Sequence, residues 1–138
     1  MNLEEIGRNL PALLAALMVA VLFLQSGLDK VFDWSGNLGW LTGHFSKTFL
    51  APLVPLLLGT ITVMELAAGT LAAVGLVYFL IASSTVIIFW STVVAALSLL
   101  SLFFGQRIAK DYPGAVSIVP YFILVLVLMF FTNPYSSR

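Results

Sequence analysis

The chain consists of long apolar blocks separated by short polar stretches. Apolar blocks occupy approximately residues 10–28, 51–104 and 113–132, and short polar stretches separate them. An α-helix needs about 20 consecutive, mainly apolar residues to cross a bilayer. The central block is too long for one crossing and long enough for two, so the pattern predicts four membrane-spanning helices.

The central block must contain a turn between its two crossings. Gly75 is its strongest helix breaker, and the pair Ser83 and Ser84 is the second choice. We therefore expect one membrane domain over residues 1–138, with spans at approximately residues 10–28, 52–75, 77–104 and 113–132. An even number of crossings places both termini on one side of the membrane.

The connection between the first two spans has a helical pattern of its own. Its apolar residues recur at intervals of three or four positions, as on one face of an α-helix: Trp34, Leu38, Leu41, Phe45 and Phe49. This favours an amphipathic helix at the membrane surface, with Trp34 and Trp40 as interfacial anchors. Three glycines within it leave an irregular re-entrant segment as the alternative.

Composition supports lipid as the main solvent. Of the 138 residues, 61% are hydrophobic and 9% charged, too few polar groups to coat a water-soluble domain. The net charge is zero, which argues against a nucleic-acid partner, and the absence of cysteine excludes disulfides and thiolate chemistry. The predicted class is an all-α membrane protein, an antiparallel four-transmembrane-helix bundle with an interfacial amphipathic segment between its first and second spans.

The polar turn before the last span contains signals for the start of a helix. Asp111 is placed to cap this span, and Pro113 suits its first turn. Pro120 lies inside the span, where we expect it to kink the helix or to mark an irregular start.

Glu65 is the most informative residue, because it is the only charge between residues 51 and 104. An ionisable side chain inside a span costs about 2.5–3.5 kcal/mol on insertion scales, so we expect it to face protein or a water-filled cavity. The small residues Gly69 and Ala72 share its helix face and predict a close helix contact there. Its role is either functional, as a proton carrier, ligand or ion-pair partner, or structural, as a protonated hydrogen-bonding group.

Three polar residues are candidate partners of Glu65: Gln25, Lys30 and Arg107. Lys30 lies just after the first span, where it meets the membrane surface and where a lysine commonly extends toward water. The alternative is that Lys30 or Arg107 folds inward and pairs with Glu65 or with a bound anion.

For the remaining candidate residues, the sequence favours a structural role over a functional one. Ser84, Ser91 and Ser98 recur at heptad spacing, which indicates a packing seam first and a polar cavity lining second. His44 is the only histidine, and with no further ligands of its kind we expect a surface residue and no metal site. Catalytic residues are not recognisable from any motif.

Three stretches resemble the DoxX-like family of small four-helix membrane proteins. They are the Gly-x-x-Lys pattern from Gly27 to Lys30, the segment from Gly59 to Gly75 that contains Glu65, and the polar turn from Gly105 to Pro113. The resemblance covers nearly the whole chain. It implies an accessory subunit of a quinone-linked membrane oxidoreductase, with a quinone as a ligand, no covalent cofactor, and a place in the bacterial inner membrane.

Two alternatives to a subunit stay open: an assembly protein without chemistry of its own, and a small transporter in which Glu65 takes up a proton. The expected partners are the lipid bilayer and either other membrane subunits or further copies of this chain. The expected docking surfaces are the serine seam and the aromatic last span, especially Phe122, Phe130 and Phe131.

Overall fold

The structure, a computed structural model, describes residues 2–136. Within that range it is built from helices and turns, without β-strands. In chain order its elements are α1 (Leu3–Arg8), α2 (Leu10–Phe32), α3 (Trp34–His44), the 3₁₀ turn η1 (Ala51–Leu53), α4 (Val54–Ala82), α5 (Val86–Ile108) and α6 (Tyr112–Thr132).

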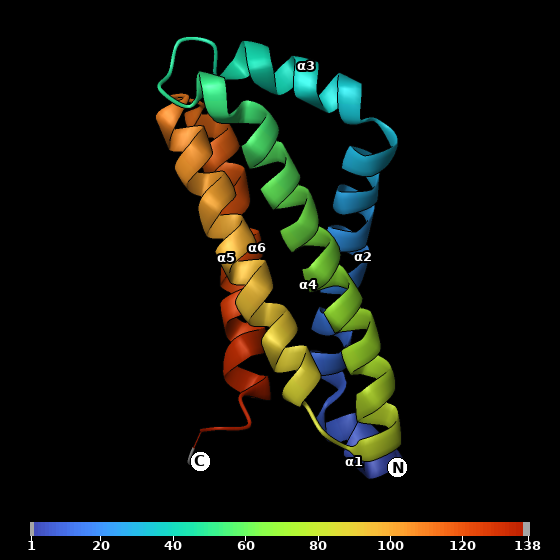
Figure 1. Cartoon of the computed structure of the whole chain (residues 1–138). Coiled ribbons are helices and arrows are strands. Elements are labelled where there is room, and N and C mark those ends of the chain that lie inside the picture. Colours follow the sequence, from blue (N-terminus) through green and yellow to red (C-terminus); the bar gives the residue numbers. More distant parts are fainter. Residues whose placement is uncertain (1, 137–138) are drawn as a thin grey trace.

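Four of these helices, α2, α4, α5 and α6, are long and apolar enough to cross a bilayer. They run alternately in opposite directions, and α3 lies across one end of them, far from both termini (Figure 1). Helix α2 packs on α4, α4 on α5, and α5 on α6, whereas α2 and α6 touch more sparsely. The predicted four-helix membrane bundle is therefore confirmed.

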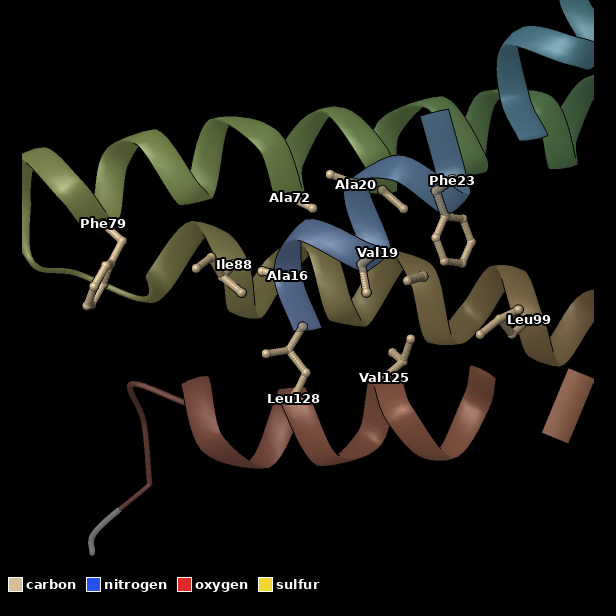
Figure 2. Packing of buried hydrophobic residues seen from close by; sticks show 12 residues of the cluster. Ala16, Val19, Ala20, Phe23, Ala72, Phe79, Ile88, Leu99, Val125 and Leu128 are labelled. Carbon is tan, nitrogen blue, oxygen red and sulfur yellow. The ribbon is translucent and has the colours of Figure 1, made fainter. Parts of the chain in front are cut away.

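The bundle core combines small residues with a few large ones. Ala16, Ala20 and Ala72 are almost fully buried, and larger side chains such as Phe23 and Leu128 fill the space between the helices (Figure 2). Small residues allow the backbones of membrane helices to approach closely, which increases van der Waals contact.

Glycine produces the closest approach between α4 and α5. A Cβ added at Gly75 would lie 2.8 Å from the backbone nitrogen of Ile88. The predicted turn at Gly75 is therefore wrong, since this glycine serves helix packing and α4 continues to Ala82. The turn falls instead at the second choice, where Ser83 adopts a left-handed conformation (φ 55°) and donates its N–H to the carbonyl of Phe79.

The first span and the surface helix also differ from the predicted boundaries. The first span continues from residue 28 to Phe32 as part of α2. The predicted surface helix ends at His44, and turns carry the chain from residue 45 to 50. The ring of Phe45 packs beside Gly105 of α5, whereas Phe49, expected on the same helix face, is 68% exposed.

Helix α6 begins as its sequence predicts. The Asp111 carboxylate accepts a hydrogen bond from the backbone N–H of Gly114 at 3.0 Å, which caps the helix, and Pro113 lies in the first turn. Pro120 is accommodated within a helix that continues to Thr132, so the irregular start expected as one alternative does not occur.

Candidate functional site

The site is an ion pair between α2 and α4. The Nζ atom of Lys30 lies 2.8 Å from Oε1 of Glu65, and the two side chains are 16% and 4% exposed. Oε1 of Glu65 has no hydrogen-bond partner among the described residues, and the Lys30 ammonium is the charge that faces it. The stabilisation of the Glu65 carboxylate therefore comes mainly from the opposite charge at close range.

Two glycines bring the helices close enough for this pair to form. A Cβ on Gly69 would lie 2.7 Å from the backbone nitrogen of Leu24, and a Cβ on Gly27 would lie 3.2 Å from that of Leu66. The contact at Gly27 places the neighbouring Glu65 beside the last turn of α2. Lys30 belongs to that turn, where the negative end of the helix dipole also favours a cation.

Ser26 completes the site by fixing the lysine. The Lys30 ammonium donates a hydrogen bond to the Ser26 hydroxyl oxygen at 2.9 Å, one helical turn earlier in α2. The ammonium also donates to the Ser26 carbonyl oxygen at 3.5 Å, so it has three polar contacts at the edge of the bundle. Sequence analysis did not single out Ser26, although its spacing of four residues from Lys30 is a usable signal.

The structure brings together Lys30 and Glu65 but neither of the other candidate partners. Gln25 is exposed on α2 and lies in a groove toward α6. The Arg107 guanidinium lies 4.5 Å from the centre of the Tyr112 ring, in a cation–π contact at the end of the bundle. Arg107 therefore has no part in the ion pair.

The predicted serine seam is only partly present. Ser91 and Ser98 are fully buried in α5, but Ser84 belongs to the turn before this helix, where it accepts a hydrogen bond from the N–H of Val86. The Ser91 hydroxyl donates to the carbonyl of Ile88, whereas Ser98 Oγ is buried without a hydrogen-bond partner in the described residues. Ser91 and Ser98 therefore lie on the buried face of α5, where small side chains allow close helix packing.

Ala72 and the aromatic residues of the last span differ in burial. Ala72 is completely buried in the core, on the helix that carries Glu65. Phe130 and Phe131 are 62% and 61% exposed on the outer surface of α6, whereas Phe122 is half-buried. Trp90 of α5 is 47% exposed on the outer surface of the bundle.

A second polar cluster lies at the α3 end of the bundle. Nε2 of His44 lies 2.7 Å from Oε1 of Gln106 and 3.8 Å from Oδ2 of Asp111, and the imidazole stacks on the Trp40 ring. These contacts join the end of α3 to the last turn of α5, through Gln106, and to the following turn, through Asp111. His44 was expected on the surface; it is half-buried, and no sequence spacing links it to Gln106, 62 residues away.

The described residues form a four-helix membrane bundle, in which the Lys30–Glu65 ion pair joins α2 to α4. Residues 2–136 contain no group of three histidine, aspartate or glutamate side chains that could hold a metal ion. Comparisons with protein-family models, with curated proteins and with solved structures find no match. The function must therefore be inferred from the chain's own residues.

Proposed function

We propose that the chain is an accessory subunit of a quinone-linked membrane oxidoreductase complex in the bacterial inner membrane. The Lys30–Glu65 pair is the observation that supports an accessory role, because the carboxylate inside α4 already has a counter-charge. A carboxylate held in this way joins α2 to α4. The pair therefore favours a structural contribution to a larger assembly.

Two further features support a subunit. The described extramembrane parts are short, and the longest connects α2 to α4 through α3. The outer surface of α6 carries large exposed side chains, including Phe131, which can pack against another membrane helix as well as against lipid. The link to quinone chemistry comes from the resemblance of three sequence stretches to the DoxX-like family.

Purification from the host membrane tests this proposal. The chain would be tagged, isolated in lipid nanodiscs without denaturing detergent, and analysed for particle mass and for copurifying proteins. We expect stoichiometric recovery of a quinone-reactive redox protein, and loss of that protein's quinone activity when the gene for this chain is deleted. A monomer or homo-oligomer with transport activity of its own would contradict the proposal.

A proton-coupled carrier is the second candidate, and one observation favours it. The Lys30 side chain retains 16% exposure at the edge of the bundle, so water can reach one side of the pair. Glu65→Gln discriminates between the two functions, with Glu4→Gln on exposed α1 as the matched control. A subunit should still assemble with its partners and keep their activity, whereas a carrier should lose transport while its assembly is unchanged.

A further inference from the structure

Helices α4 and α5 each carry a stripe of buried residues, and the two stripes have mirrored spacing. On α4 the stripe is Glu65, Ala68, Ala72 and Gly75, and on α5 it is Ile88, Ser91, Ala95 and Ser98. The helices run in opposite directions, and their stripes meet at one end, where a Cβ on Gly75 would lie 2.8 Å from the backbone nitrogen of Ile88 (Figure 1).

This contact sets the level of the residues at the other end of the stripes. Glu65 lies ten residues before Gly75, and Ser98 lies ten residues after Ile88. Each residue advances an α-helix by the same distance, about 1.5 Å. Glu65 and Ser98 are therefore placed in one layer of the bundle, on the stripes along which α4 and α5 face each other.

The hydroxyl of Ser98 differs from the other buried hydroxyls of the bundle helices. Those of Thr62, Ser91 and Thr132, for example, each donate to a carbonyl of their own helix. Ser98 Oγ is fully buried and has no hydrogen-bond partner among the described residues. A buried hydroxyl without a partner costs stability, so this group is available to a partner in a second state of the bundle.

Glu65, in the same layer, needs a different partner when it is neutral. Its Oε1 atom now faces the Lys30 ammonium at 2.8 Å. A proton added to the carboxylate removes the charge that attracts Lys30 and creates an O–H donor. An ammonium donates hydrogen bonds and accepts none, so Lys30 cannot satisfy this new donor.

The other charged groups on the helices packed against α4 are engaged or exposed elsewhere. Within the described part of the chain, Lys30 is the one residue that forms an ion pair with Glu65. Asp29 of α2 is exposed, whereas His44 of α3 and Arg107 of α5 have partners of their own at the α3 end of the bundle. The acceptor for a neutral Glu65 is therefore an uncharged group.

We propose that Ser98 is the hydrogen-bond partner of the neutral Glu65 carboxyl. A proton from water at the edge of the bundle is transferred to a carboxylate oxygen, the pair with Lys30 breaks, and the new O–H donates to Ser98 Oγ. Lys30 remains 16% exposed and keeps its hydrogen bonds to Ser26. Proton uptake thus moves the polar attachment of α4 from α2 to α5.

The proposal goes beyond the accessory role and holds for a subunit as for a carrier, because it concerns the bundle itself. Its tests use the isolated chain. Their failure is therefore distinct from failure of the copurification experiment.

Unfolding titrations in mixed micelles at neutral pH provide the first test. Glu65→Gln places a neutral amide at this position, and its N–H can donate to Ser98 Oγ as the neutral carboxyl does. In this background, Ser98→Ala should increase the unfolding equilibrium constant about fivefold, as expected for one neutral hydrogen bond. With Glu65 intact, Ser98→Ala should not increase it.

Ser91→Ala is the matched control for this titration. Its hydroxyl donates to the carbonyl of Ile88 on its own helix, so the substitution should have the same effect with Glu65 or with glutamine at position 65. If Ser98→Ala also has the same effect in both backgrounds, Ser98 does not respond to the charge of Glu65 and the proposal is overturned.

Infrared spectroscopy provides a second test, which does not require Glu65→Gln to fold. The full chain in phosphatidylcholine nanodiscs is acidified, and the carbonyl bands of the protonated carboxyl groups are recorded. Among the described carboxylates only Glu65 is buried. Its band should move to higher frequency in Ser98→Ala, because hydrogen bonding to a carboxyl group lowers its carbonyl frequency, and should stay in place in Ser91→Ala. Identical acid-induced spectra for the unmodified chain and Ser98→Ala would mean that water satisfies the carboxyl, and would reject the proposal.

Discussion

The contact between α2 and α4 and the contact between α4 and α5 are similar in shape but different in chemistry. Both depend on glycine: Gly69 admits the backbone of α2 at Leu24, and Gly75 admits the backbone of α5 at Ile88. Only the first contact contains charges, those of Lys30 and Glu65. In the second, the buried polar group Ser91 donates to the backbone of its own helix and makes no hydrogen bond across to α4.

The comparison indicates that close packing and polar attachment occur independently in this bundle. The contact between α4 and α5 has close packing alone, whereas the contact between α2 and α4 has both. Helices in lipid gain no hydrophobic stabilisation from association, so van der Waals contact must hold them together. Between α4 and α5, the fit of the two surfaces therefore provides the stabilisation. The contact between α2 and α4 adds an electrostatic bond that breaks if either partner is changed.

Lys30→Met should have the largest effect. The substitution leaves the Glu65 carboxylate buried without its counter-charge, and removing one partner of a buried pair typically costs about 3–5 kcal/mol. We expect a loss of that order in the free energy of unfolding, measured by denaturant titration in mixed micelles. Lys47→Met, at an exposed lysine with no ion pair, should change stability little.

The double variant Lys30→Met with Glu65→Leu sharpens this prediction. Replacing a buried ion pair by apolar residues is often neutral or stabilising, because the desolvation cost of both charges is removed. The double variant should therefore regain most of the stability that Lys30→Met loses. If the two single substitutions simply add, the residues do not interact and the contact between α2 and α4 is held by shape alone, like the other contact.

Gly75→Val should be the next largest in effect. A side chain at this position meets the backbone of Ile88, which cannot rotate away as a side chain can. Overpacking of this kind costs about 1–3 kcal/mol, and we expect a corresponding fall in the midpoint of thermal unfolding. Gly39→Ala is the control, since nothing lies within 4 Å of its added Cβ; stability there should stay level or rise.

Much of this fold follows from the sequence because its determinants are local. Four apolar segments of spanning length specify four helices, and Asp111 with Pro113 specifies where α6 begins. The turn between α4 and α5 was placed incorrectly because glycine has two roles in membranes, as helix breaker and as packing residue. Only the neighbour of Gly75 in space distinguishes these roles.

The site was less predictable than the fold. The burial of Glu65 could be expected from the energy of a charge in a span, and Lys30 was one of three polar candidates for its partner. Selecting Lys30 over Gln25 required the register between α2 and α4, which Gly27 and Gly69 set through close contacts. The link between His44 and Gln106 joins residues 62 positions apart and left no pattern in the sequence.

His44→Ala probes a contact that lies outside both helix contacts. It removes the short contact to Gln106 and the ring stacking on Trp40, so we expect a loss of about 1 kcal/mol. The effect should be local. Hydrogen–deuterium exchange should rise in α3 and the following turn, while α2, α4 and α5 keep their protection. Uniformly faster exchange would mean that α3 is needed for the whole bundle.

Ser98→Ala should have the smallest effect, and its sign is informative. Its hydroxyl oxygen is buried and has no hydrogen-bond partner in the described residues, so removing it relieves a desolvated polar group and should raise stability by up to ~1 kcal/mol. Ser91→Ala on the same helix is the matched comparison, because Ser91 donates to the carbonyl of Ile88 and should lose about 0.5–1 kcal/mol. Opposite signs in the two unfolding titrations would support a contact between α4 and α5 held by shape. Equal losses would instead mean that Ser98 binds an internal water molecule, and that this contact also has a polar attachment.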